Sequence, residues 1–264
     1  MLSGELDMKK AAVILLMAMS VIGNAQAKEW KSVRIGIEGA YPPFSRTEAN
    51  GELTGFDVDI AKALCEQMQV KCTIVQQDWD GMIPSLLARK FDAIISTMDI
   101  TPERLKRVDF SDRYQHVPAR FATIKGRGIE LTDSFMKGKK IGVQRATSMD
   151  SYISDNFPDA DIKRYGTSEE SYLDLKAGRV DYVLADYASL MDGLIKKEDG
   201  AKYELVGPGL TDPRWFGIGA GVALRKSDTD LKAMFNKAIK DIRANGKYKA
   251  VNDKYFDFDA YGDN

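Results

Sequence analysis

The chain has 264 residues, and its 38 Lys and Arg residues are balanced by 39 Asp and Glu residues, which leaves a formal net charge of −1 at pH 7. Because the basic residues are scattered and matched by acidic ones, the composition argues against a nucleic-acid-binding surface. The single histidine, His116, has no cysteine, histidine or acidic cluster near it in the sequence. This argues against a hydrolytic triad and a histidine-based zinc site, so we expect no metal and no catalytic residues.

The chain begins with a predicted export signal. Residues 8–27 read MKKAAVILLMAMSVIGNAQA, which contains two lysines, an apolar run and an Ala-Gln-Ala cleavage pattern. The apolar run is too short and wrongly flanked to span a membrane permanently. The preceding MLSGELD is polar and acidic, so we interpret it as an extension outside the signal. Residues 1–27 are therefore predicted to be a signal peptide with an N-terminal extension.

The remaining residues alternate short apolar runs rich in β-branched residues with amphipathic segments, which predicts an α/β protein. The predicted strands are residues 33–37, 72–77, 92–96, 121–125, 140–144, 181–186 and 218–225. The predicted helices are residues 57–68, 80–89, 102–107, 148–156, 168–177, 186–196 and 228–244. Such alternation indicates parallel strands joined by crossover helices.

The first cysteine lies near the end of the predicted helix at 57–68, and the second lies seven positions further along, at the start of the next predicted strand. In an oxidising compartment a local pair such as Cys65 and Cys72 most simply forms a disulfide, and free thiols are the alternative.

Polar and aromatic residues stand at the carboxyl end of one predicted strand after another. They are Tyr41, Trp79, the segment 96–99, Thr147, Ser148 and Asp186. In open α/β sheets ligands collect beyond the carboxyl ends of the strands, so these residues are candidates for one site.

Arg104 stands where a cation is unfavourable. Thr101 is a suitable N-cap and Pro102 suits the first helical position, so Arg104 falls in the first turn of a predicted helix. The helix dipole favours negative charge there. Arg104 therefore either binds an anion or pairs in solvent with Glu103 or Asp109.

Five stretches of the chain, taken together, resemble a known family. They are GIEGAYPPF, GELTGFDVDIAKALCEQMQVKC, DWDGMIPSLLARKFDAIISTMDITPER, IGVQRATS and DLKAGRVDYVLAD. From about Val33 to Tyr261 the chain resembles the periplasmic solute-binding proteins of polar amino-acid ABC transporters, especially the arginine and lysine/arginine/ornithine branches.

The resemblance implies the two-lobe, type II periplasmic binding protein fold. Each lobe is then a mixed sheet flanked by helices, and the ligand lies in the interlobe cleft. The implied divisions are lobe I at 28–115 and 219–264, and lobe II at 116–218, with hinge crossings near 116–119 and 211–219.

The resemblance also implies how an amino-acid head group is bound. Arg104 would receive the α-carboxylate, which a guanidinium matches bidentately, and Asp186 would receive the α-ammonium. An N-cap of the following helix is the alternative role for Asp186. Ser96 and Thr97 would contact the head group through backbone or hydroxyl groups, and the helix start at Ser148 would offer further donors.

The ligand's side chain would be recognised by a second set of residues. Tyr41 and Trp79 could sandwich a planar cation, and Glu38 would bind its terminal charge, with Gln144 nearby. Asp99 either adds negative charge near the ammonium or caps its own loop. Each aromatic could instead be ordinary packing.

The function implied is capture of a cationic L-amino acid in the periplasm by a monomer without a cofactor, and delivery to an inner-membrane ABC permease. Arginine is the first candidate ligand, followed by ornithine, lysine and histidine. An opine-binding importer subunit is one alternative. An exported dehydratase on the same fold is another, for which Glu38 would be the candidate acid.

Overall fold

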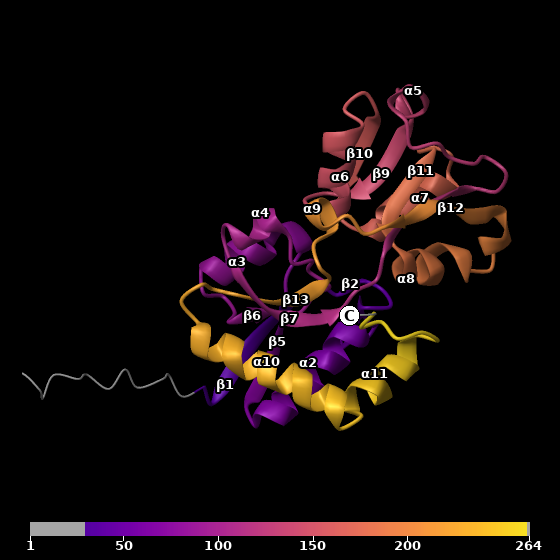
Figure 1. The fold of residues 1–264 in the computed structure, drawn as a ribbon. Helices are drawn as coiled ribbons and strands as arrows, with labels where there is room; N and C mark the ends of the chain where they lie inside the picture. Colours follow the sequence, from indigo (N-terminus) through magenta and orange to yellow (C-terminus); the bar gives the residue numbers. More distant parts are fainter. Residues whose placement is uncertain (1–29, 263–264) are drawn as a thin grey trace, which may run out of the picture.

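The computed structural model describes residues 30–262, so the predicted signal peptide at 1–27 lies outside the described residues. The described chain forms two lobes, each built on a five-stranded sheet with helices packed against it (Figure 1). No helix in this part of the chain is long and apolar enough to cross a membrane.

The first lobe contains a sheet in the order β5-β1-β6-β13-β7. Its strands are β1 (Ser32–Ile37), β5 (Lys71–Gln76), β6 (Ala93–Ile94), β7 (Asp109–Gln115) and β13 (Ala220–Leu224). β1 runs parallel to β5 and β6, whereas β13 runs antiparallel to β6 and β7. Because β13 comes from the C-terminal part of the chain, this lobe is assembled from two separate segments.

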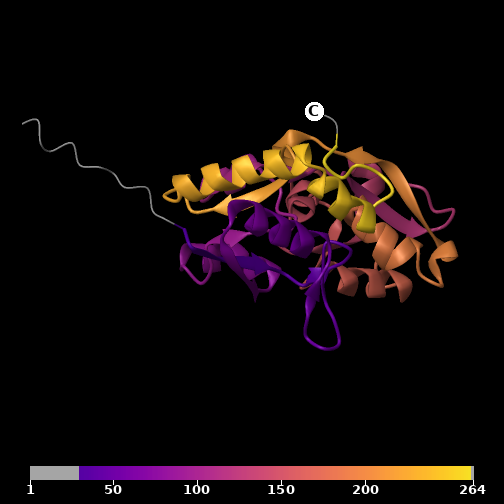
Figure 2. The same ribbon diagram turned by 90° about the horizontal axis from the view of Figure 1, so that it is seen from below.

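Helices cover both faces of the first sheet. α2 (Phe56–Met68), α10 (Thr229–Ala244) and α11 (Lys247–Tyr255) lie together on one side, as two views show (Figures 1 and 2). The 3-10 helix η1 (Trp79–Gly81), α3 (Met82–Leu87) and α4 (Pro102–Leu105) belong to the other side. A small sheet of β2 (Ala40–Tyr41), β3 (Ser45–Thr47) and β4 (Leu53–Thr54) completes the lobe.

The second lobe contains a sheet in the order β10-β9-β11-β8-β12. Its strands are β8 (Ala119–Ile124), β9 (Lys140–Gln144), β10 (Asp161–Tyr165), β11 (Tyr182–Asp186) and β12 (Tyr203–Leu210). Its helices are α5 (Asp133–Met136), α6 (Ser148–Asn156), α7 (Ser168–Lys176), α8 (Tyr187–Leu190), the π-helix η2 (Met191–Ile195), the 3-10 helix η3 (Gly200–Lys202) and α9 (Pro213–Phe216).

Two chain segments connect the sheets. β7 ends and β8 begins on either side of residues 116–118, and β12 and β13 flank residues 211–219. Gly217 has φ +66°, and a Cβ there would lie 2.2 Å from the Ile100 carbonyl oxygen. Gly219 has φ +110°, and its Cβ would lie 2.5 Å from the Gln115 carbonyl oxygen. Only glycine fits the second segment at these two points.

The seven predicted strands all have observed counterparts, and the α/β class is confirmed. The mixed sheets that the resemblance implied are confirmed. The parallel strands that the alternation alone indicated are only part of each sheet, because β8 and β13 are antiparallel to their neighbours. Each of these strands enters its sheet directly after a connecting segment, and an apolar run does not encode strand direction. The predicted helix at 186–196 is divided into α8 and the π-helix η2.

The disulfide between Cys65 and Cys72 is confirmed. It joins the last turn of α2 to the start of β5, across the left-handed turn at Gln69. The bond therefore fixes the helix against the edge strand beside it.

Candidate functional site

One cavity between the lobes brings together the residues that the family resemblance nominates for ligand binding. These residues are Glu38, Tyr41, Trp79, Ser96, Thr97, Asp99, Arg104, Gln144, Ser148 and Asp186. Thr147 and Met149 also line it. Thr147 was a candidate because it follows the strand at 140–144, whereas the sequence alone could not assign a role to the apolar Met149.

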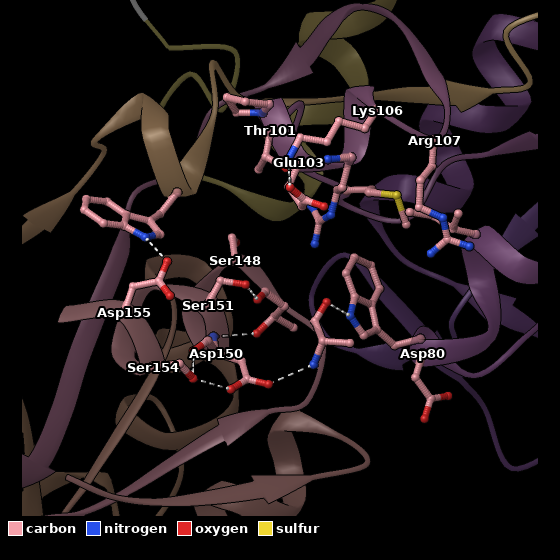
Figure 3. Close-up of a pocket in the computed structure, with 18 of the residues that line it drawn as sticks. Asp80, Thr101, Glu103, Lys106, Arg107, Ser148, Asp150, Ser151, Ser154 and Asp155 are labelled. Atoms are coloured by element: carbon pink, nitrogen blue, oxygen red, sulfur yellow. Dashed lines mark hydrogen bonds and ion pairs between the residues drawn. The ribbon is translucent and has the colours of Figure 1, made fainter. Parts of the chain in front are cut away.

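The cavity is narrow and adjoins a much wider groove. It measures about 20 Å³, against about 890 Å³ for the groove, and Trp79, Arg104, Thr147 and Ser148 line both. Figure 3 shows the groove, with Thr101, Glu103, Lys106 and Arg107 on one side and Asp150, Ser151, Ser154 and Asp155 on the other. A ligand can reach the cavity through this groove.

Arg104 lies in the first turn of α4, as expected. The Thr101 hydroxyl caps the helix by accepting from the Arg104 N–H at 3.2 Å, and Pro102 takes the first helical position. The Arg104 Nη1 donates to the Asp99 carbonyl oxygen at 3.0 Å. Its guanidinium lies 5.3 Å from the centre of the Trp79 ring.

Neither solvent partner proposed for Arg104 pairs with it. Glu103 forms an ion pair with Lys106, and Asp109 forms one with Lys232. Burial lowers the pKa of Arg104, and the nearby carboxylates of Asp99 and Asp186 oppose this effect. The guanidinium therefore faces the cavity with hydrogen-bonding capacity to spare.

Asp186 ends β11 and faces Tyr41 across the cleft. The Tyr41 hydroxyl donates to Asp186 Oδ2 at 2.7 Å and accepts from the Asp186 N–H at 3.1 Å. The Asp186 carboxylate makes no capping hydrogen bond to α8, so its alternative role as an N-cap side chain is not observed. Burial, reinforced by the charge of Asp99, raises the pKa of Asp186 well above its usual value.

Glu38 and Gln144 line the cavity and bond to each other. The Gln144 amide donates to Glu38 Oε1 at 2.6 Å and to the Gly166 carbonyl at 3.0 Å. The Ser96 hydroxyl accepts from the Glu38 N–H at 3.1 Å. Burial raises the pKa of Glu38 to about 7, although the hydrogen bond from Gln144 favours the charged form.

Asp99 and Ser148 meet in the middle of the cleft. The Ser148 hydroxyl donates to Asp99 Oδ2 at 2.5 Å, and Thr147 caps α6. Burial raises the pKa of Asp99, and the Arg104 charge opposes the rise. Nearby, the Trp79 indole N–H donates to the Ala146 carbonyl at 3.2 Å. The Asp99 carboxylate therefore bonds across the cleft, which leaves its capping alternative unsupported.

Two exposed ion pairs also join the lobes. Arg46 lies 2.9 Å from Asp192, and Arg145 lies 2.6 Å from Asp80. With the hydrogen bonds inside the cleft, they describe a closed arrangement of the lobes.

The charges in the cavity are unequal. Glu38, Asp99 and Asp186 supply three carboxyl groups, whereas Arg104 supplies one guanidinium. The three carboxyl groups all have raised pKa values, because burial disfavours their ionised forms. A ligand with two cationic groups and one carboxylate would complement this set.

The sequence model of the bacterial extracellular solute-binding proteins, family 3, matches residues 33–258. The chain belongs to this family. The solute-binding protein is 49% identical over 259 residues to the L-arginine-binding protein of Pseudomonas aeruginosa, covering 97% of this chain and 100% of that one. It is 39% identical to the lysine/arginine/ornithine-binding periplasmic protein of Escherichia coli, with 97% and 100% covered.

Solved structures agree with this membership. The solute-binding protein matches a Salmonella typhimurium periplasmic binding protein, described for its high arginine specificity, with a TM-score of 0.78 and 32% identity. The match covers 86% of this chain and 99% of that one. The two-lobe type II fold is therefore established.

Proposed function

We propose that this solute-binding protein captures a cationic L-amino acid in the periplasm, arginine first, and delivers it to an ABC permease in the inner membrane. The observation that carries the proposal is the set of three carboxyl groups, two of them buried and that of Asp99 partly buried, around one guanidinium. Two relatives support the same ligand class, because one is named as an L-arginine-binding protein and the other as a lysine/arginine/ornithine-binding protein.

The proposed pose pairs each charged group of arginine with a group of opposite charge in the cavity. Arg104 binds the α-carboxylate, and Asp186 binds the α-ammonium. Glu38 binds the guanidinium at the far end, where a planar cation can also face the rings of Tyr41 and Trp79. In this pose each cationic group of arginine meets a carboxylate, and its single carboxylate meets a guanidinium.

The proposed domain division is lobe I at 28–115 and 219–264 and lobe II at 116–218. Ligand groups contact residues of both lobes, so binding favours closure by the differential affinity for the closed form. The segments at 116–119 and 211–219 act as the hinges. Small-angle scattering with and without saturating arginine should show a smaller radius of gyration with ligand. An unchanged radius, from protein shown to be free of ligand, contradicts hinge closure.

The direct test is calorimetry on protein that has been unfolded, dialysed and refolded to remove bound ligand. The panel contains L-arginine, L-ornithine, L-lysine, L-histidine, agmatine and octopine. L-arginine should bind most tightly, and agmatine, which lacks the carboxylate, should bind poorly. Tightest binding of octopine would favour the opine alternative, and equal binding of agmatine would contradict the role of Arg104.

The proposed role is binding without turnover, as a monomer. Glu38 accepts a hydrogen bond from Gln144 that favours its charged form, which suits a partner for a cationic ligand group. Incubation with prephenate or arogenate should give no product, and measurable turnover would replace this proposal with the dehydratase alternative.

A further inference from the structure

Thr97 is held in a backbone conformation that threonine rarely adopts. Its φ is +49°, in the left-handed region, where a β-branched side chain is disfavoured. Thr97 belongs to the loop at 96–99, and it lines the ligand cavity with Ser96 and Asp99. Strained backbone of this kind persists only where the surroundings hold it.

Two buried residues outside the cavity hold Thr97. The Thr97 N–H donates to the Tyr114 hydroxyl oxygen at 2.8 Å, and the Thr97 hydroxyl donates to Asp57 Oδ2 at 2.8 Å. The Tyr114 hydroxyl in turn donates to Asp57 Oδ1 at 2.8 Å. Asp57 comes from α2 and Tyr114 from β7, so this triangle of hydrogen bonds ties the loop to two elements of the core.

The carboxylate of Asp57 is buried in the first turn of α2. Asp57 is 1% exposed and Tyr114 is fully buried. Asp57 forms no ion pair within the described part of the chain, and its two observed side-chain donors are hydroxyl groups. A buried carboxylate without a cationic partner destabilises a fold relative to an apolar side chain. This cost is consistent with a role for Asp57 at the site that it adjoins.

We propose that Asp57 and Tyr114 are positioning residues that hold Thr97 in its strained conformation and commit it to accepting hydrogen bonds. This inference rests on the proposed function. The N–H and the hydroxyl proton of Thr97 are donated to Tyr114 and Asp57. The carbonyl and hydroxyl oxygens of Thr97 can therefore only accept hydrogen bonds from a ligand. A primary ammonium is the head group that such acceptors select.

The expected loss of arginine affinity follows from the cost of the left-handed backbone conformation at Thr97. Without the Tyr114 hydroxyl, the loop populates conformations in which Thr97 has negative φ, and ligand must select the remaining competent fraction. The usual cost of such a backbone conformation corresponds to arginine binding that is about fivefold to a hundredfold weaker.

The test is a double-mutant cycle of Tyr114→Phe and Thr97→Gly, with dissociation constants for L-arginine from calorimetry. Tyr248→Phe is the matched control, because it removes another buried tyrosine hydroxyl from the same lobe, one that bonds the Tyr114 carbonyl at 2.8 Å and not Thr97. Both tyrosine variants should lower the melting temperature. Only Tyr114→Phe should weaken arginine binding at least fivefold.

Glycine adopts positive φ without steric cost. In the Thr97→Gly background, adding Tyr114→Phe should therefore weaken binding by less than about twofold. An equal penalty in both backgrounds, or no penalty in the Thr97 background, overturns the proposal.

A crystal structure of Tyr114→Phe gives a second readout that requires no ligand. Thr97 should leave the left-handed region, and an unchanged φ refutes the proposed hold. If wild-type protein fails to bind arginine while Thr97 still moves in this variant, the proposed function fails and the positioning role survives.

Discussion

Replacing Glu38 by Gln should change ligand affinity and stability in opposite directions. Glutamine keeps an oxygen that can accept the 2.6 Å hydrogen bond from Gln144, so the local packing is preserved while the charge is lost. At pH 8 the variant should bind arginine at least tenfold more weakly, because the ligand guanidinium is buried without its carboxylate.

The ionisation of Glu38 gives the expected size of the change in arginine affinity with pH. The pKa of Glu38 is raised from 4.5 to about 7 by burial, so about nine-tenths of the wild-type protein is ionised at pH 8 and about one-hundredth at pH 5. A cationic ligand binds the ionised form and lowers the pKa in the complex. Wild-type affinity for arginine should therefore fall by roughly a hundredfold from pH 8 to pH 5.

The stability of the protein without ligand should depend on pH in the opposite direction from its affinity for arginine. Between pH 4.5 and about 7 the folded protein binds more protons at Glu38 than the unfolded chain does, so the free energy of unfolding without ligand falls as pH rises through this window. At about 1.4 kcal/mol per pH unit, the ionised Glu38 costs roughly 3 kcal/mol above pH 7. Glu38→Gln should recover much of that stability.

Calorimetry at pH 5, 6, 7 and 8 measures the affinity, and urea unfolding at the same pH values measures the stability. Glu52→Gln, an exposed acid in the same lobe, is the control and should change neither. Because the pKa values of Asp99 and Asp186 are also raised, any pH dependence that remains in the variant is assigned to these two groups. A wild-type affinity that is constant from pH 8 to pH 5, or an identical profile in Glu38→Gln, would refute the reasoning.

Three further changes test other parts of the structure. Arg104→Ala should weaken arginine binding at least tenfold, whereas Arg107→Ala, an exposed position three residues along, should leave it within twofold by calorimetry. Replacing Cys65 and Cys72 by Ser should lower the free energy of urea unfolding by about 2 to 3 kcal/mol, as expected for a short closed loop, and leave arginine affinity unchanged. Arg145→Gln breaks an exposed ion pair at the rim, so it should weaken binding by less than about fivefold, and by less still in 0.5 M salt.

Sequence patterns predicted the buried strands better than the strands at the sheet edges. The three five-residue or longer strands that were missed, β7, β10 and β12, all lie at an edge. An edge strand buries fewer side chains, so its apolar pattern is weak: β10 reads DIKRY, and β12 contains two glycines and a proline. The helix α11 was missed for the same reason, because KYKAVNDKY is mostly polar.

The site residues could be nominated from the sequence, but their partners could not. The rule that ligands lie beyond the carboxyl ends of strands, together with the family resemblance, placed Tyr41 and Asp186 at the cleft. Their hydrogen bond joins residues 145 positions apart on different lobes, so it depends on how the lobes close. The role inferred for Asp57 also depends on contacts that are distant in the sequence, because it requires α2, β7 and the loop at 96–99 to come together.

The cross-cleft hydrogen bonds also bear on selectivity. Glu38 accepts from an amide, Asp186 from a phenol and Asp99 from a hydroxyl, so each carboxyl group already has a neutral donor in the closed form. A ligand that displaces these donors gains affinity only from the difference between its own hydrogen bonds and those it replaces. Hydrogen bonds from charged donors are about twice as strong as those from neutral ones, and they favour the ionised carboxylates that burial disfavours. Two cationic groups therefore gain at both ends of the cavity, whereas a neutral amino acid of similar length would gain only at its head group.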